Sequence, residues 1–376
     1  MSKKVKIAIA GLGNCASSMI QGLEYYKSAD DDAFVPGLMH VRFGDYHISD
    51  VEVVAAFEVN KLKIGKDVAD AIWEHPNVAR KFADVPKTGV EVLPGPIMDG
   101  VAPHMRESFH VYDPKEIPTV DVAEALKEAG ADVLINFTPV GSEEASKVYA
   151  QACLDSGVSF ANGIPTFIVS EPTWAKKFLD AGIPVAGDDI KSQLGATILH
   201  RVLMKLALDR GIRVKETFQL NVGGNTDFEN MKYENRLHTK RISKTEAVTS
   251  VLPYDVPTRI GPSDYVPFLG DEKVCYITME GYNFGDNPVY VQLKLSVQDS
   301  PNSAGVMIDV IRALKIARDR GLAGPIYTIS AYSFKHPPVQ IPDFLAKELI
   351  ERFLKGESDI ELVKPYLSQF PMKEVA

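Results

Sequence analysis

Apolar segments that are one strand long alternate with helix-like segments through the first half of the chain. Residues 4–10, KVKIAIA, form such a strand, and Met19, Ile20 and Leu23 then recur at helical spacing. Later segments up to residue 189 repeat this order of strand and helix. Strands that are apolar on both faces and alternate with helices predict a doubly wound parallel sheet in an α/β fold.

The pattern changes after about residue 200. The segments KETFQLNVGG, KVCYITMEGYNF and VYVQLKLSVQDS are longer and carry polar interruptions, which is typical of antiparallel strands with one wetter face. We therefore predict a first domain at residues 1–200, completed by residues 303–376. Residues 201–302 are predicted to form an inserted αβ domain built on a largely antiparallel sheet, to which the family resemblance described below assigns catalysis and oligomerisation.

Two later segments carry weaker signals. Residues 325–332, PIYTISAY, are expected to return to the first sheet as a strand. Residues 250–268, SVLPYDVPTRIGPSDYVPF, are rich in proline and are the expected mobile loop.

Composition narrows the range of partners and compartments. The 376 residues carry 41 Lys and Arg against 50 Asp and Glu, a formal net charge of −9, which argues against nucleic acid or a membrane surface as the main partner. Cys15, Cys153 and Cys275 are too scattered for a disulfide framework. The basic N-terminus leads into a glycine turn and not into a cleavage site, so we expect a cytoplasmic protein without an export signal or membrane span.

The first strand is followed by GLGNCA, which places Gly11, Gly13 and Ala16 in the G-x-G-x-x-A form of a Rossmann-type dinucleotide site. Gly11 permits a tight turn, and Gly13 lets the backbone approach a pyrophosphate at the helix N-terminus. Glu58, at the end of a later strand, is placed to accept from a ribose hydroxyl and to repel a 2′-phosphate, which favours NAD. Glu58 lies farther from the glycines than is usual, so an insertion is expected. A βα turn with only a structural role is the alternative.

A second set of residues is typical of an anion site. The segment GDDIKSQLGAT follows a predicted strand and is expected to start a helix at about Ser192, where free N–H groups and the hydroxyls of Ser192 and Thr197 would hold a phosphate. A plain helix N-cap is the alternative. Lys240 and Lys244 lie four residues apart on one predicted helix face, where like charges repel unless an anion lies between them. Asn225 adds a neutral donor.

Two lysines are candidates for chemistry at a carbon. Lys240, if partly desolvated, is expected to have a lowered pKa and to carry a proton at a carbon being oxidised. Lys335 lies in AYSFKHPP, where two prolines fix the backbone that aims its ammonium group. Taken singly, each lysine is interpreted as a solvated surface residue. Their occurrence beside the other motifs favours a shared site.

Eight blocks together carry a resemblance to a known family. They are GLGNCAS, FTPVGSEEA, GDDIKSQLGAT, LNVGGNTDFENM, KRISKTEAV, GPSDYVP, FGDNPVYVQLKL and VQDSPNSAGV. In this order they resemble myo-inositol-1-phosphate synthases, specifically the bacterial branch, from Val5 to about Ile341. The resemblance implies an isomerase of inositol and phospholipid biosynthesis that assembles as a homotetramer.

The resemblance also implies the reaction. Such enzymes use NAD to oxidise carbon 5 of D-glucose 6-phosphate, enolise the ketone, close carbon 6 onto carbon 1, and reduce carbon 5 again to give 1D-myo-inositol 3-phosphate. By resemblance, Lys240 handles the carbon 5 oxygen and its proton, Lys335 the aldehyde oxygen, and Lys244 the phosphate. The bound phosphate would help to remove the carbon 6 proton.

Further site residues follow from the same resemblance. The implied cofactor contacts are Gly11, Gly13, Asn14, Cys15, Ala16, Glu58, Thr138, Pro139, Gly163, Asp189, Asp227, Asp299 and Ser300. The implied phosphate contacts are Ser192, Gln193, Thr197, Asn225 and Lys244. Asp286 is an implied catalytic residue.

One departure from the family pattern affects the charge of the site. Eukaryotic members have a lysine two residues after the aspartate of the GD block, where this chain has Pro288. One cation is therefore expected to be missing, and a bound divalent or monovalent cation, held by carboxylates such as Asp189, Asp286 or Asp299, is expected to replace it. The alternatives are an NAD-dependent dehydrogenase with net redox on a phosphorylated substrate, and a cofactor-binding regulator without activity.

Overall fold

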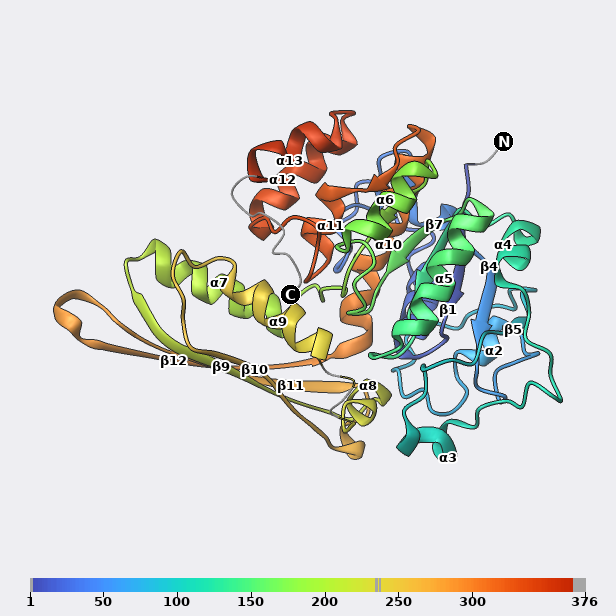
Figure 1. Ribbon diagram of the computed structural model, residues 1–376, viewed down its shortest axis with the longest axis horizontal. Coiled ribbons are helices and arrows are strands. Elements are labelled where there is room, and N and C mark those ends of the chain that lie inside the picture. The colour runs from blue at the N-terminus through green and yellow to red at the C-terminus, as the bar shows by residue number, and fades with distance from the viewer. Residues whose placement is uncertain (1–2, 234–235, 237, 368–376) are drawn as a thin grey trace.

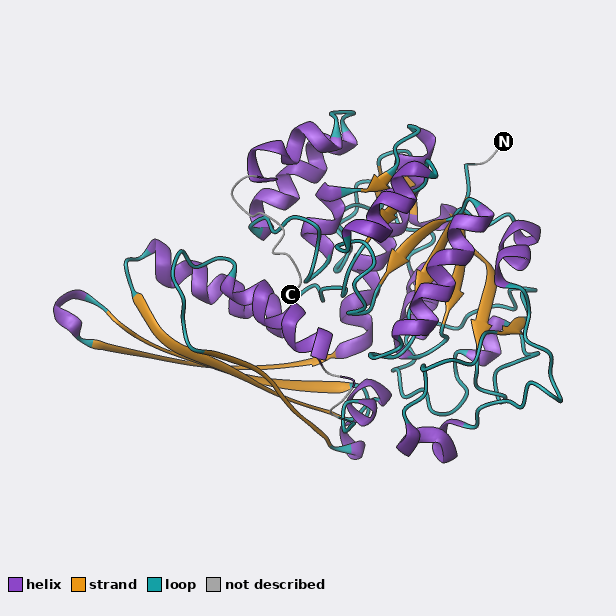
Figure 2. Cartoon of the chain, viewed as in Figure 1, coloured by secondary structure: helices purple, strands orange, loops and turns teal. Residues whose placement is uncertain are grey.

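A seven-stranded parallel sheet forms the centre of the larger unit of the chain (Figures 1 and 2). The computed structural model describes residues 3–233, 236 and 238–367. The strand order is β13-β8-β7-β6-β1-β4-β5, and neighbouring strands pair in parallel. The strands are β1 (Val5–Ala10), β4 (Val51–Glu58), β5 (Val92–Pro94), β6 (Val133–Asn136), β7 (Ser159–Asn162), β8 (Pro184–Ala186) and β13 (Gly324–Pro325). The predicted doubly wound sheet is confirmed.

Helices cover both faces of this sheet. The helices α1 (Asn14–Tyr25) and α10 (Asp299–Asp319) pack on one face, and α4 (Val122–Ala129), α5 (Glu143–Ser156) and α6 (Pro172–Asp180) pack on the other. In β1, Val5, Ile7 and Ile9 belong to the first core, whereas Ala8 and Ala10 belong to the second. Because successive strand residues point to opposite faces, a continuously apolar strand is buried on both sides.

An insertion separates β1 from β4, as the spacing of Glu58 from the glycines predicts. It contains a two-stranded hairpin, β2 (Arg42–Phe43) with β3 (Tyr46–His47). The short helices α2 (Val68–Ala71) and α3 (Arg106–Phe109) follow β4.

The C-terminal part of the larger unit is helical. It contains α11 (Tyr327–Ser333), α12 (Asp343–Leu354) and α13 (Asp359–Leu367). The prediction of a strand at residues 325–332 is wrong, because only Gly324 and Pro325 join the sheet and α11 begins at Tyr327. The carboxylate of Asp359 accepts from the backbone N–H groups of Tyr327 at 2.7 Å and Thr328 at 3.0 Å. A distant residue therefore caps this helix, and no local pattern indicates it.

A separate four-stranded sheet forms the second unit, in the order β10-β9-β11-β12. Its strands are β9 (Arg213–Gly223), β10 (Thr258–Tyr265), β11 (Glu272–Tyr282) and β12 (Pro288–Gln298). The β9–β11 and β11–β12 pairs are antiparallel, whereas β10 pairs with β9 in parallel. Helices α7 (Ala196–Asp209) and α9 (His238–Thr249) lie on one face, and α8 (Thr226–Asn230) lies near the larger unit (Figure 1).

The prediction of a mobile loop at residues 250–268 is wrong for the second half of this segment, which forms β10. β10 is an edge strand, and its register shifts between Ile260 and Ser263, on either side of Pro262. An edge position and a register shift are the places where a strand tolerates a residue without an N–H group.

Two helices connect the two units along the chain. The domain boundaries predicted at residues 200 and 303 fall inside α7 and α10, which connect the units. Among the described residues, no helix combines the length and the apolar character that crossing a bilayer requires.

Gly305 lets α10 pass close to the loop at residues 35–38. A Cβ atom at Gly305 would lie 1.8 Å from the carbonyl oxygen of Gly37. We expect Gly305→Ala to lower the free energy of unfolding by about 1–3 kcal/mol, because backbone must move to relieve the overlap. Urea titration measures this change. Gly22→Ala in α1 is the matched control, since its Cβ would lie 3.8 Å from Ile308 and is expected to be neutral or mildly stabilising. Equal losses in both variants would contradict the steric explanation.

Candidate active site

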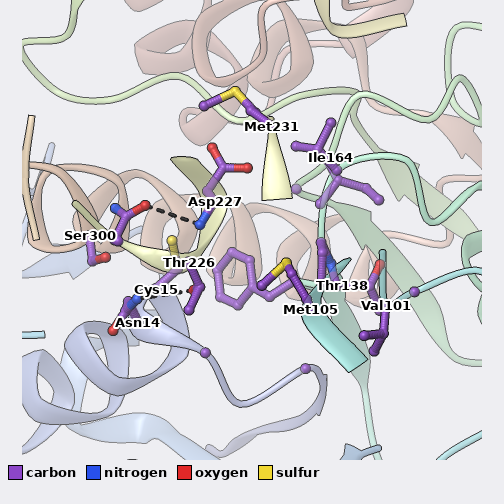
Figure 3. A pocket seen from close by; sticks show the side chains of 18 of the residues that line it. Asn14, Cys15, Val101, Met105, Thr138, Ile164, Thr226, Asp227, Met231 and Ser300 are labelled. Carbon is purple, nitrogen blue, oxygen red and sulfur yellow. Dashed lines mark hydrogen bonds between the residues drawn. The ribbon is translucent and has the colours of Figure 1, made fainter. Parts of the chain in front are cut away.

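A cavity of about 890 Å³ lies between the two sheets. One wall comes from the glycine turn after β1 and from the ends of β4, β6 and β7, and the other comes from α7, β9, α8, α9 and β11. In Figure 3, Asn14 and Cys15 of α1 lie opposite Thr226 and Asp227 of α8. The position beyond the carboxyl ends of parallel strands is where open α/β sheets bind ligands.

Most residues predicted from the sequence line this cavity. They are Gly11, Gly13, Asn14, Cys15, Glu58, Thr138, Pro139, Gly163, Asp189, Ser192, Thr197, Asn225, Asp227, Lys240, Lys244, Asp299, Ser300 and Lys335. Three predicted residues lie outside it. Ala16 is fully buried in the core beneath the glycine turn, and Gln193 donates its side-chain N–H to the carbonyl oxygen of Gly37.

Asp286 is the third residue outside the cavity, and the expectation that it acts there does not fit the geometry of one chain. It is exposed in the turn that joins β11 to β12. In the ladder, Tyr282 pairs with Pro288 beside this turn, whereas Glu272 pairs with Gln298 at the opposite end, near the cavity. Figure 1 shows the turn at the far end of the hairpin, away from the larger unit.

The glycine turn has the geometry of an anion-binding turn. Gly11 has φ +91°, and a Cβ there would lie 2.7 Å from the carbonyl oxygen of Phe137. Gly13 is the N-cap of α1, and nothing lies within 4 Å of its Cβ position. No side chain caps this helix end, so its first N–H groups remain available to a ligand.

Glu58 lines the cavity, but backbone groups already use much of its hydrogen-bonding capacity. Its carboxylate accepts from the N–H groups of Leu12 at 3.0 Å, Val59 at 2.7 Å and Asn60 at 3.3 Å. The buried ammonium of Lys63 lies 3.7 Å away. The side chain is therefore held rigidly beside the glycine turn.

Six lysines line the cavity. Lys61 and Lys63 follow β4, and the other four are Lys240 and Lys244 of α9, Lys335 after α11, and Lys273 of β11, which the sequence analysis missed. Three of them contact aspartates. The pairs are Lys240 with Asp227 at 2.6 Å, Lys273 with Asp299 at 3.0 Å, and Lys335 with Asp189 at 2.7 Å. Each pair joins two different elements, so the pairs fix loops and helix ends around the cavity.

Lys244 differs from the other three lysines. Within the described part of the chain, it has no carboxylate at ion-pair distance. Burial, followed by repulsion from Lys240, Lys273 and Lys335, holds the pKa of Lys244 well below its usual value. Both causes would be offset by an anion bound beside this ammonium group.

The N-terminus of α7 faces the same space. Gly195 is its N-cap without a side-chain bond, and Ala196, Thr197 and Ile198 line the cavity. The predicted helix start at Ser192 is therefore four residues too early, although Ser192 still lines the cavity. The free N–H groups of a 14-residue helix and the Lys244 ammonium together form a candidate phosphate site.

Lys273 supplies a positive charge that the sequence analysis did not count. Pro288 lies at the exposed end of β12, remote from the cavity. A lysine at this position would therefore not bring its charge into the cavity, whereas Lys273 does. The place of Lys273 follows from the register of the hairpin, which pairs Lys273 with Val297, two residues before Asp299. Among the described residues, no group of three or more His, Cys, Asp or Glu side chains is placed to hold a metal ion.

A glycine turn on a parallel sheet, facing a lysine-rich cavity under a second sheet, is typical of enzymes that hold a dinucleotide beside a phosphorylated substrate. The family model for myo-inositol-1-phosphate synthase matches residues 195–300. The inositol-3-phosphate synthase of Corynebacterium glutamicum is 54% identical over 358 residues, covering 93% of this chain and 98% of that protein. Its namesake in Mycobacterium tuberculosis is 54% identical, covering 94% of this chain and 97% of that protein.

A solved structure also resembles this chain. A myo-inositol-1-phosphate synthase-related protein from Thermotoga maritima has a TM-score of 0.78 and 25% identity, covering 94% of this chain and 98% of that one. The chain belongs to the myo-inositol-1-phosphate synthase family.

Cys15, the cysteine that lines the cavity, is in an environment that disfavours the nucleophilic thiolate. Burial, together with the negative charge of Asp299, raises the pKa of Cys15 to about 12. We expect iodoacetamide at about pH 8 to alkylate Cys15 far more slowly than a free thiol, because only the thiolate reacts. Mass spectrometry of the intact chain over time measures this rate. Rapid single-site modification at Cys15 would contradict the expectation and would favour a dehydrogenase that uses a covalent thiol intermediate.

Proposed function

We propose that this chain is an inositol-3-phosphate synthase that converts D-glucose 6-phosphate to 1D-myo-inositol 3-phosphate, also named L-myo-inositol 1-phosphate, with NAD as a recycled cofactor. The observation that carries the proposal is the group of four lysines in one cavity beside the glycine turn. The similarity to inositol-3-phosphate synthases over nearly the whole chain supports it.

The wall of the parallel sheet would hold NAD, which supplies a hydride acceptor at carbon 5 and then returns the hydride. The N–H groups of the glycine turn and of α1 would bind the pyrophosphate. Glu58 would accept from a ribose hydroxyl, and Thr138, Pro139 and Gly163 would line the remainder of the bound cofactor.

The lysines would act on the oxygens of the sugar. As a neutral amine, Lys240 would take the carbon 5 hydroxyl proton and later return it, and Asp227, 2.6 Å away, would stabilise the ammonium that forms in between. Lys335, held by Asp189, would stabilise the aldehyde oxygen as it becomes an alkoxide. Cations fixed by ion pairs stabilise developing negative charge without first having to reorganise.

The phosphate would lie between Lys244 and the N-terminus of α7, near Ser192 and Asn225. Lys273 would add positive charge to the same space, and the sequence analysis assigned it no role. A phosphate oxygen placed in this way is a candidate base for the carbon 6 proton. A bound divalent or monovalent cation stays a prediction; two of its expected ligands, Asp189 and Asp299, line the cavity in ion pairs with Lys335 and Lys273.

The assembly proposed for this enzyme is a homotetramer, and the proposed location is the cytoplasm. In the four-stranded sheet, the face away from α7 and α9 carries Phe218, Leu220, Tyr276 and Tyr290, each at least 39% exposed. Apolar side chains grouped on an uncovered sheet face are typical of a contact between subunits.

Incubation of the chain with glucose 6-phosphate and NAD tests the proposed activity. We expect an inositol phosphate to form without net NADH, because carbon 5 is oxidised and reduced within one turnover. Phosphate-ester chromatography and absorbance at the NADH band measure the two quantities, with and without a chelator. Steady accumulation of NADH would favour the plain dehydrogenase instead.

A lysine variant provides the matched control for this assay. Lys240→Met should lower kcat by about 10²- to 10⁴-fold, the range typical of a lost proton carrier. Lys66→Met, at a surface lysine paired with Glu74, should leave kcat unchanged. Full turnover by the Lys240 variant would exclude that role for Lys240.

Binding of the sugar phosphate should be coupled to proton uptake at Lys244. In the free chain the pKa of Lys244 lies well below its usual value, so Lys244 loses its proton at a lower pH than an ordinary lysine; a bound dianion favours the charged form and raises this pKa. The affinity for the sugar phosphate should therefore fall as the pH rises above the lowered pKa of Lys244. Calorimetric titration in two buffers of different ionisation enthalpy, at about pH 8.5 where the phosphate is already a dianion, measures the protons taken up. Lys244→Met should abolish the uptake, and an unchanged proton count in that variant would refute the coupling.

A further inference from the structure

A buried ammonium group lies beside the glycine turn, and the proposed chemistry does not use it. Lys63 follows β4 and is 1% exposed. Its Nζ donates to the carbonyl oxygen of Leu12 at 2.7 Å and to Oδ1 of Asn77 at 2.9 Å. It lies 3.7 Å from the carboxylate of Glu58, which is 5% exposed. A charge removed from water to this extent is costly unless its partners offset the loss of hydration.

The partners of Lys63 converge on one residue of the turn. Leu12 lies between Gly11 and Gly13, and its N–H donates to Oε2 of Glu58 at 3.0 Å. Its carbonyl oxygen accepts from Lys63 and from Nδ2 of Asn77 at 3.0 Å. Both polar backbone groups of this single residue are therefore held by buried side chains.

This arrangement sets the direction of the next N–H group. In a trans peptide the carbonyl oxygen of one residue and the N–H of the following residue point in opposite directions. Because Lys63 and Asn77 hold the Leu12 oxygen on their side of the turn, the Gly13 N–H points to the other side. The space around the Cβ position of Gly13 is open, since no atom lies within 4 Å of it.

Lys63 also balances a charge. The carboxylate of Glu58 bonds to the same turn that would hold a pyrophosphate, and an uncompensated carboxylate there would repel it. Burial lowers the pKa of Lys63, whereas the neighbouring Glu58 opposes that shift. The two opposite charges are both nearly inaccessible to water, so Lys63 offsets the charge of Glu58 beside the turn.

We propose that Lys63 is a positioning residue for the cofactor: it orients the Leu12–Gly13 peptide and neutralises Glu58, so that the turn can bind the pyrophosphate of a dinucleotide. This inference rests on the proposed use of NAD. It assigns Lys63 no contact with the reacting atoms.

The test measures NAD affinity of the full chain by calorimetric titration. Lys63→Met should weaken NAD binding about tenfold or more, because the Leu12 oxygen loses a charged donor and Glu58 loses its counter-ion. At saturating NAD, kcat should stay within about twofold, since chemistry occurs at the other wall of the cavity. Lys66→Met, three residues away and with its side chain 41% exposed, is the matched control and should bind NAD as the unchanged chain does.

A double variant separates charge balance from simple packing. Glu58→Gln combined with Lys63→Met removes the unpaired carboxylate, so it should bind NAD more tightly than Lys63→Met alone. A purely packing role for Lys63 predicts no such recovery. The proposal is overturned if Lys63→Met binds NAD within about twofold of the unchanged chain, or if the double variant shows no recovery.

Two further outcomes are distinguishable. If Lys63→Met is recovered unfolded, as judged by circular dichroism, Asn77→Ser carries the test, because it removes the second donor to the Leu12 oxygen and keeps the charge pair. About threefold weaker NAD binding by that variant supports the proposal, and unchanged binding overturns it. Failure of the unchanged chain to bind NAD would instead overturn the proposed function.

Discussion

Charge balance inside the cavity is the constraint on which the arrangement of the site depends. Four ammonium groups in one partly buried space repel each other, and each would be costly to bury alone. Three aspartates offset this cost, and each lies on a different element from its lysine. Asp299 begins α10 and meets Lys273 of β11, so the first turn of a helix that packs on the parallel sheet is held against the four-stranded sheet. The electrostatics of the site and the placement of the two units are therefore coupled.

Neutral contacts reinforce this junction. Asn14 in the first turn of α1 donates to the hydroxyl of Thr226 in α8 at 3.4 Å, a contact drawn in Figure 3. The side-chain oxygen Oδ1 of Asn14 accepts from the backbone N–H groups of Val78 and Ala79. Asn14, which the family resemblance places at the cofactor, thus also joins three separate segments. A side chain with both a donor and an acceptor suits this position better than a charged one, which would need a further counter-ion.

The sequence predicts what depends on local periodicity and misses what depends on pairing between distant segments. The apolar run of β1 and the G-x-G-x-x-A turn predict the parallel sheet and its ligand-binding edge, because strand period and glycine conformation are local properties. Lys273 lines the cavity and Asp286 lies outside it, although the sequence analysis named only Asp286, because the register of the β11–β12 hairpin decides which end faces the cavity. In the same way, the cap that Asp359 provides for α11 acts over 32 residues, and a propensity-based reading of residues 325–332 favours a strand.

The two walls of the cavity would recognise their anions by different physical means. On the parallel-sheet wall, Lys63 and Glu58 balance each other, so the pyrophosphate would meet mainly backbone N–H dipoles, whose orientation is fixed by the fold and is independent of pH. On the opposite wall, Lys244 has no carboxylate at ion-pair distance among the described residues, and burial and the neighbouring lysines lower its pKa, which a bound anion would raise again. Fixed dipoles suit a cofactor that is regenerated within each cycle. An ammonium group with a lowered pKa suits a substrate that enters and leaves. Its full charge is needed only while the phosphate is bound, and the phosphate then offsets the repulsion from the other lysines.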